Sequence, residues 1–182
     1  MEIRFHGRGG QGTVIASKIL AMAVSKEGKY VQAFPEFGVE RRGAPVQAFI
    51  RIKDDIIYEK SKIYYPDHIV ILDPTLILSV DVTSGLKDGG WIIINSERNP
   101  KDFNFKGNFK VATVDATSIA MKYGIGSRAS PIVNTAILGS VVKVLHLCKL
   151  DSIIEAVKEE VPIKPMENIN AVKEAFESVK GV

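Results

Sequence analysis

A glycine-rich segment near the N-terminus constrains the fold of this 182-residue chain more than any other feature of its sequence. Gly7-Arg8-Gly9-Gly10-Gln11-Gly12 matches the pattern G-x-G-x-x-G. It follows a strand-like stretch, Glu2–His6, and precedes Thr13–Ser25, whose apolar residues recur at helical spacing. A glycine loop between a strand and a helix lets the backbone approach an anion, which the free N–H groups and positive dipole end of the helix then favour. The segment therefore predicts an α/β fold and a candidate anion site.

The rest of the chain alternates strand-like and helix-like segments. Further strands are expected at Tyr30–Phe34, Val46–Lys53, Ile69–Leu72, Trp91–Ile94 and Val111–Val114. Helices are expected after Asp73-Pro74 and at Thr117–Lys122, Pro131–Leu147, Asp151–Glu160 and Met166–Val179. This alternation predicts a three-layer α/β/α Rossmann-like domain with a mostly parallel sheet, spanning residues 1–182 as a single domain.

One segment interrupts the alternation. Val46–Lys53 and Ile56–Lys60 flank Asp54-Asp55, and this arrangement predicts an inserted β-hairpin.

The glycine loop alone leaves its ligand open. A dinucleotide reading would use Glu36 as the acidic ribose-binding residue, although Glu36 follows Pro35 in what the sequence predicts to be a loop. A P-loop reading fails because Thr13 follows Gly12 directly and the required lysine is absent. A tight strand-to-helix turn, or a contact with another protein, explains the same glycines. The spacing of the glycines alone favours neither anion binding nor a purely structural role.

A second unusual segment, Phe34–Pro45, combines two phenylalanines, two prolines and the adjacent arginines Arg41 and Arg42. Exposed loops of such composition are typical of recognition. Either arginine could grip a phosphate or a partner's carboxylate. The alternative is a solvated loop with its rings packed locally.

Polar residues also follow three of the predicted strands. Asp73, Asn95 and Asp115 would share the sheet edge with the glycine loop, and capping of the following helices is the favoured explanation for the two aspartates. Within Pro131–Gly139, Asn134 and Thr135 form a polar pair whose role, a cap or a subunit contact, stays open. No acid, base and nucleophile assemble into a catalytic set.

Composition excludes several classes of protein. The formal net charge is +3, too small and scattered to indicate nucleic-acid binding. No apolar run reaches the roughly 18 residues of a membrane span, and the N-terminus lacks the layout of a signal peptide. Cys148 is the single cysteine, so internal disulfides, cysteine-based zinc sites and clusters held by this chain are excluded. No histidine pair shows metal-ligand spacing. A cytoplasmic location is expected.

The two long motifs, Phe5–Gly12 and Gln32–Pro45, resemble the gamma subunit of the 2-oxoacid:ferredoxin oxidoreductases. Shorter segments follow in the order of that family, namely Asp73-Pro74, Val80–Thr83, Gly85–Lys87, Ile93–Asn95, Val114–Thr117 and Pro131–Gly139. The similarity covers nearly the whole chain. The segment Gly38–Pro45 resembles the pyruvate and 2-oxoisovalerate branch more than the small subunit of the indolepyruvate enzyme.

The resemblance implies a function in a larger enzyme, a pyruvate synthase or a relative. That reaction converts a 2-oxoacid, CoA and oxidised ferredoxin into acyl-CoA, carbon dioxide and reduced ferredoxin. Thiamine diphosphate, Mg²⁺ and iron–sulfur clusters are expected on alpha, beta and delta subunits, and ferredoxin is expected to act through the complex. This chain is expected to be inactive alone, with an assembly role and a CoA-docking role.

The candidate residues for contact with CoA phosphates or a partner subunit are Arg8, Gly9, Gly10, Gln11, Gly12, Arg41 and Arg42. Two alternatives stand beside this reading. One is the small subunit of a 2-oxoisovalerate or indolepyruvate enzyme, and the other is a free-standing NAD- or nucleotide-binding protein.

Overall fold

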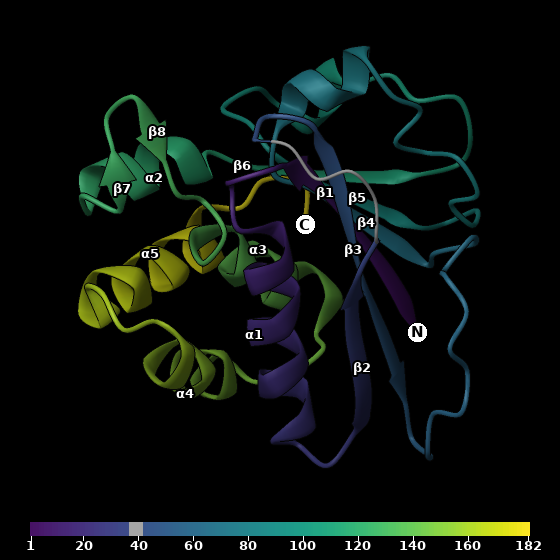
Figure 1. The fold of residues 1–182 in the computed structure, drawn as a ribbon. Coiled ribbons are helices and arrows are strands. Elements are labelled where there is room, and N and C mark those ends of the chain that lie inside the picture. Colours follow the sequence, from purple (N-terminus) through teal and green to yellow (C-terminus); the bar gives the residue numbers. More distant parts are fainter. Residues whose placement is uncertain (37–41) are drawn as a thin grey trace.

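A six-stranded sheet organises the computed structural model, which describes residues 1–36 and 42–182 (Figure 1). Its strands are β1 (Glu2–Arg8), β2 (Tyr30–Pro35), β3 (Pro45–Lys53), β4 (His68–Ile71), β5 (Trp91–Asn95) and β6 (Lys110–Val114). The order across the sheet is β2-β3-β1-β4-β5-β6. Strands β1, β4, β5 and β6 pair in parallel, whereas β3 is antiparallel to both β1 and β2. The mostly parallel α/β fold expected from the sequence is confirmed.

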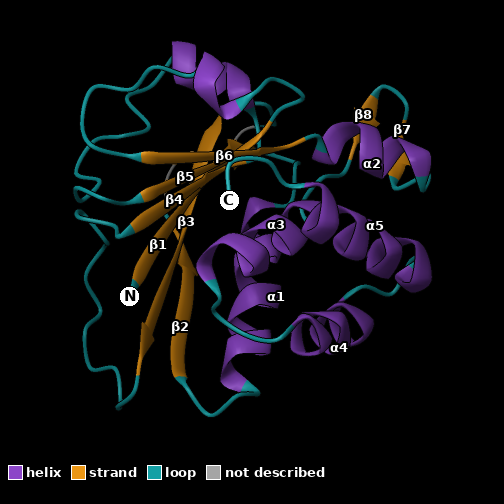
Figure 2. Ribbon diagram, turned by 180° about the vertical axis from the view of Figure 1, so that it is seen from behind, coloured by secondary structure: helices purple, strands orange, loops and turns teal. Residues whose placement is uncertain are grey.

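Five α-helices lie on one face of the sheet (Figure 2). They are α1 (Thr13–Ser25), α2 (Ala116–Lys122), α3 (Ala136–Leu145), α4 (Leu150–Glu160) and α5 (Pro165–Ser178). The larger hydrophobic core lies between these helices and the sheet, with fully buried residues such as Phe5, Leu20 and Val141. No helix in the described part of the chain has the length and apolar character needed to cross a membrane.

The opposite face carries a thinner layer. It consists of two 3₁₀ helices, η1 (Pro74–Leu78) and η2 (Pro100–Asp102), and of the connections around them. A second, smaller apolar cluster lies beneath them, where Ile71 and Ile94 of the sheet pack with Leu76 of η1. The side chain of Asp73 caps η1 by accepting a hydrogen bond from the N–H of Thr75. Pro74 occupies the first position of the 3₁₀ helix.

The expected hairpin is built differently from the prediction. Strand β3 forms, but Ile56–Lys60 contains no strand, and β3 pairs instead with β2 and β1. A small two-stranded sheet, β7 (Gly126–Ser127) with β8 (Ser130–Pro131), lies elsewhere. It also shortens the helix expected at Pro131–Leu147, because Pro131 pairs with Gly126 and α3 begins only at Ala136.

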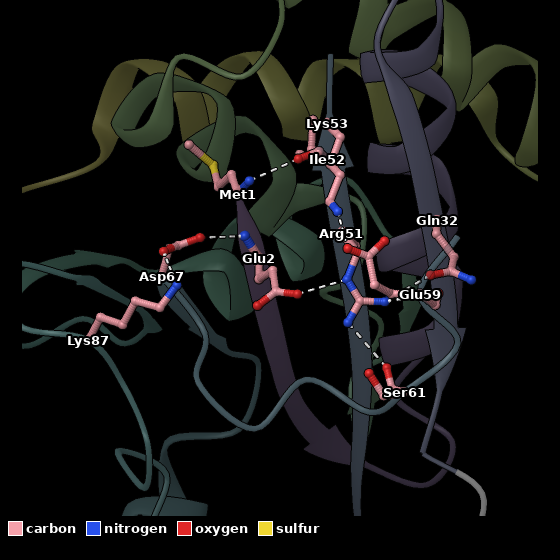
Figure 3. A network of polar contacts seen from close by, with 10 residues as sticks. All are labelled: Met1, Glu2, Gln32, Arg51, Ile52, Lys53, Glu59, Ser61, Asp67 and Lys87. Carbon is pink, nitrogen blue, oxygen red and sulfur yellow. Dashed lines mark hydrogen bonds and ion pairs between the residues drawn. The ribbon is translucent and has the colours of Figure 1, made fainter. Parts of the chain in front are cut away.

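Strand β3 has no free edge for the chain that follows it, because β1 and β2 occupy both, and a buried arginine holds that chain instead (Figure 3). Arg51 on β3 is 4% exposed and its Nε donates to Glu2 Oε1 at 2.7 Å. Its two terminal nitrogens donate to the backbone oxygens of Glu59 and Ser61, each at 3.2 Å. Arg51 thus holds the connection from β3 to β4 against the thinner face of the sheet.

We expect Arg51→Met to lower the free energy of unfolding by about 3 kcal/mol, because it leaves Glu2 and two carbonyls without their buried partner. The matched control is Lys53→Met on the same strand, which removes only a partly exposed ion pair with Glu59 and should cost less than about 1 kcal/mol. Urea denaturation of both variants measures the difference. Equal losses would show that Arg51 has no special role.

A second buried pair lies on β1. Arg4 donates from Nε to His6 Nε2 at 3.0 Å and from its NH2 group to the carbonyls of Val82 and Ser84. Burial, reinforced by the adjacent Arg4 charge, lowers the pKa of His6 to about 3. His6 is therefore neutral in the folded chain at neutral pH, and its Nε2 is free to accept the hydrogen bond.

This pKa predicts a pH-dependent stability. Between pH 6.5 and about 3 the unfolded chain binds a proton at His6 and the folded chain does not, so stability falls as the pH falls. We expect the wild-type chain to lose about 2 kcal/mol more than His6→Gln between pH 7 and pH 5, because glutamine accepts the Arg4 hydrogen bond without titrating. Urea denaturation at both pH values tests this, and parallel curves would contradict it.

Candidate functional site

The glycine loop connects β1 to α1 as the sequence predicts. A turn closes after Arg8, whose carbonyl accepts from the N–H of Gln11 at 3.0 Å. Gly10 and Gly12 have φ angles of 94° and 78°, in the region that glycine occupies without strain. Helix α1 begins at Thr13 and runs to Ser25, the bounds expected from the sequence.

Two of the glycines are required by close packing. A Cβ on Gly7 would lie 2.0 Å from Thr13 Oγ1, and a Cβ on Gly12 would lie 2.4 Å from Asn134 Nδ2. The first contact brings α1 against β1, and the second brings the start of α1 against the segment before α3. The pattern therefore has a structural purpose here in addition to any ligand it binds.

Three hydrogen bonds hold the guanidinium of Arg8 in place. Its Nε donates to Asp73 Oδ2 at 3.0 Å, and its two terminal nitrogens donate to the Gly43 carbonyl at 3.0 Å and to Thr75 Oγ1 at 2.8 Å. Gln11 completes the network, because its Oε1 accepts from the N–H of Arg8 and its Nε2 donates to Asp73 Oδ2. The side chains of Arg8 and Gln11 thus shape the loop from within.

Asp73 is the acceptor at the centre of this network. Burial opposes ionisation of its carboxyl, but hydrogen bonds from Thr75 and Gln11, together with the charge of Arg8, outweigh that effect and lower its pKa. The carboxylate is therefore charged at neutral pH, as the ion pair with Arg8 requires.

The second unusual segment lies beside the glycine loop. Gly9 donates from its N–H to the Ala44 carbonyl at 2.9 Å and accepts from the N–H of Gly43 at 3.0 Å. Arg42 is exposed, and its Cγ lies 3.8 Å from the place a Cβ on Gly10 would take. Arg41 lies outside the described residues. The structure thus brings two motifs together that are more than thirty positions apart in the chain.

A groove of about 730 Å³ opens beside the glycine loop. One wall is formed by the first turn of α1, with Val14 and Ile15, and the opposite wall by Ile132 and by the connection between α4 and α5, with Ile163. Most of the lining is apolar. The groove has the size of a small-molecule site, with polar groups at a few positions only.

The polar lining includes two residues that the sequence did not identify as candidates. Asn134 is buried, its Oδ1 accepts from the N–H of Thr135 at 2.8 Å, and its Nδ2 lies against Gly12. Lys164 lies across the groove and donates from Nζ to the Gly124 carbonyl at 2.6 Å. Asn134 belongs to the segment Pro131–Gly139, whose polar pair was the only sequence signal, and nothing in the sequence marks Lys164.

A chain of buried hydrogen bonds holds the far wall in place. Thr135 donates from Oγ1 to Asn168 Oδ1 at 2.5 Å, and Asn168 donates from Nδ2 to the Lys164 carbonyl at 2.8 Å. Lys164 has a φ of 53°, a strained value for a residue with a side chain. The bonds from Asn168 offset that strain and fix the backbone that carries the lysine.

The start of α1 is electrostatically suited to an anion. The helix has 13 residues, its first turn contains no acidic residue, and no side chain caps it. Its first N–H groups and its dipole therefore favour a negative group at this end of the groove. The site has the chemistry of a binding groove with an anion-accepting end.

The other polar residues at the sheet edge have structural partners. Asp115 accepts from the N–H of Ser118 at 2.9 Å, and Asn95 donates to the Leu72 carbonyl at 2.9 Å. Together with Asp73 they cap or bridge neighbouring elements, and the preference for capping by Asp73 and Asp115 is confirmed. Glu36, the residue a dinucleotide reading requires, forms an ion pair with Lys62.

Comparison with known proteins identifies the chain's relatives. Residues 2–178 match the family model described as pyruvate ferredoxin/flavodoxin oxidoreductase. The chain is 55% identical to the pyruvate/ketoisovalerate oxidoreductases common subunit gamma of Thermococcus kodakarensis, over 97% of this chain and 95% of the relative. It is 48% identical to the pyruvate synthase subunit PorC of Methanothermobacter thermautotrophicus, over 99% of this chain and 96% of the relative.

Solved structures agree. The crystal structure of the pyruvate oxidoreductase subunit PORC of Thermotoga maritima matches with a TM-score of 0.83 at 36% identity, covering 99% of this chain and 97% of that one. The keto/oxoacid ferredoxin oxidoreductase gamma subunit of Geobacter sulfurreducens matches with a TM-score of 0.78 at 25% identity, covering 97% and 94%. The resemblance read from the two long motifs is confirmed. The chain belongs to the pyruvate ferredoxin/flavodoxin oxidoreductase family, in which it is a gamma subunit of the 2-oxoacid:ferredoxin oxidoreductase type.

Proposed function

We propose that this gamma subunit helps to bind CoA where it meets the partner subunits of its oxidoreductase. The complex would convert pyruvate and CoA into acetyl-CoA and carbon dioxide while it reduces ferredoxin. The observation that carries the proposal is the groove beside the glycine loop, with its anion-accepting helix end and apolar walls. The phosphates of CoA suit the start of α1, and its longer, less polar arm suits the walls formed by Val14, Ile15 and Ile163.

Arg42 is the arginine best placed to add a charge to this site. It is exposed beside Gly10, and no hydrogen bond joins its guanidinium to another described residue. Arg8, by contrast, uses its guanidinium on Asp73, Thr75 and Gly43. We therefore assign phosphate contact to Arg42 and to the N–H groups of the loop, and a positioning role to Arg8.

The redox chemistry would belong to the partner chains. Cys148 is half-buried, and burial raises the pKa of its thiol to about 12, whereas cluster ligands are thiolates and several are needed. Within residues 1–36 and 42–182, no group of three His, Cys, Asp or Glu side chains could hold a metal ion. We place thiamine diphosphate, Mg²⁺ and the iron–sulfur clusters on alpha, beta and delta subunits, and the whole complex in the cytoplasm.

A second substrate has support from a relative. The Thermococcus kodakarensis protein is named as a subunit common to pyruvate and ketoisovalerate oxidoreductases. We propose that this chain likewise can serve a 2-oxoisovalerate enzyme. The groove described above is assigned to CoA, and none of its residues is assigned to recognition of the 2-oxoacid. Substrate choice would then depend on the partner that holds thiamine diphosphate.

Arg42→Gln tests the CoA assignment. In the reconstituted complex we expect the KM for CoA to rise about fivefold, equivalent to ~1 kcal/mol, with the KM for pyruvate unchanged. The matched control is Lys106→Gln, which removes one exposed positive charge from the connection between η2 and β6, whereas Arg42 lies beside Gly10 of the groove lining. An unchanged KM for CoA in Arg42→Gln, or an equal rise in the control, would contradict the assignment.

Arg8→Ala tests whether Arg8 positions the glycine loop. Loss of three hydrogen bonds at the loop should lower the yield of assembled complex as well as CoA affinity. A variant that assembles fully and binds CoA normally would remove Arg8 from both roles.

A further inference from the structure

Strand β2 forms one margin of the sheet, and no strand from residues 1–36 and 42–182 lies beyond it. Its sequence, Tyr30-Val31-Gln32-Ala33-Phe34-Pro35, contains no charged residue. Proteins usually protect such edges with charges, bulges or a covering element, because an edge strand offers unpaired backbone groups to any other strand. Here Ala33, at the middle of the strand, is exposed. The edge therefore has the properties of a pairing surface.

The register of β2 against β3 shows which backbone groups face outward. Glu36 donates from its N–H to the Gln47 carbonyl, and these two residues are in register with the β2–β3 ladder. In an antiparallel ladder such bonded pairs recur at every second residue, so Phe34 and Gln32 also point their backbone groups at β3. Val31 and Ala33 point theirs away from the sheet, and no described residue bonds them. Pro35 presents only a carbonyl on that side.

Several side chains of the strand already have partners on its two faces. Val31 packs toward the core on the side of α1. On the other face Gln32 accepts from Arg51 at 3.1 Å, and Phe34 packs on Phe49 with ring centroids 5.3 Å apart. The outward backbone groups of Val31 and Ala33 have no partner among the described residues, so the occupant that fits them is another strand lying in the plane of the sheet.

We propose that two copies of this chain pair through β2, antiparallel and about a two-fold axis at Gln32. In this register Val31 of each copy faces Ala33 of the other, and each such pair exchanges two backbone hydrogen bonds. The N–H of Lys29 meets the carbonyl of Pro35, and because proline has no N–H, this pair forms one hydrogen bond instead of two. The two sheets then join into one continuous sheet.

The strand is complementary to a copy of itself. Tyr30 comes to lie opposite Phe34 of the second copy, an aromatic cross-strand pair, and the two Gln32 side chains meet at the axis. Lys29, which precedes the strand, is paired with Asp54, and Glu36, which follows it, is paired with Lys62, so neither end of β2 presents an unpaired charge that would repel a second copy. No residue of β2 lines the groove, so this pairing is independent of the proposed CoA site.

Cysteine crosslinking tests the register. Gln32→Cys places its two thiols opposite each other at a non-hydrogen-bonded position, where Cα atoms lie about 4.5 Å apart, within disulfide range. We expect mild oxidation to convert most of the purified full-length variant into a disulfide-linked dimer. Tyr30→Cys is the matched control, on the same face and 46% exposed before substitution. Its two thiols would lie about 14 Å apart and should not crosslink.

Ala33→Pro tests the pairing without a crosslink. It removes an N–H that points outward, so the β2–β3 ladder keeps its bonds while the dimer loses two of its own. Sedimentation across a concentration series should show a dimer for the wild-type chain and for Ala33→Ser, and a monomer for folded Ala33→Pro. A monomeric wild-type chain, or equal crosslinking of both cysteine variants, overturns the proposal. So does a wild-type edge that becomes protected from hydrogen exchange only when partner subunits are added.

Discussion

The ion pair between Arg8 and Asp73 connects three parts of the chain that are far apart in sequence. It joins the end of β1 to the turn after β4, and the same guanidinium bonds the Gly43 carbonyl in the connection before β3. Ion pairs of this exposure contribute little by charge alone, but this one lies in a network of directed hydrogen bonds with Thr75 and Gln11. The conformation of the glycine loop, and with it one rim of the groove, depends on that network.

The glycine fingerprint therefore acts through packing first. Gly7 and Gly12 allow contacts with Thr13 and Asn134 that any side chain would prevent. A nucleotide-binding protein uses the same spacing to admit a phosphate, whereas in this chain the glycines bring β1, α1 and the segment before α3 together. The anion-accepting end of α1 follows from this arrangement, since the loop leaves the first N–H groups of the helix uncapped.

The sequence predicted local elements well and long-range ones less well. Helix α1 has its expected bounds because helical spacing of apolar residues and flanking glycines agree at both ends. The strand expected at Ile56–Lys60 is wrong because β1 and β2 already occupy both edges of β3, long-range contacts that alternation of residue types does not reveal. The β2–β3 pairing was missed for the same reason, since register is a property of two segments together.

The site was predicted in part. The glycine loop and Arg42 were identified from composition and spacing, and the structure places them side by side. Asn134 and Lys164 could not be assigned, because the groove is built from the start of α1, the segment before α3 and the connection before α5. The start of α1 meets the segment before α3 where Gly12 packs on Asn134, and that segment meets the connection before α5 through the bonds from Thr135 to Asn168 and from Asn168 to the Lys164 backbone. Groups of this kind, namely backbone N–H groups, one amide and one ammonium, are not the clustered acids, bases and metal ligands by which catalytic sites are usually recognised in a sequence. The candidate groove is therefore defined by the shape that three distant segments form together, and shape of this kind cannot be derived from the spacing of residues within any one of them.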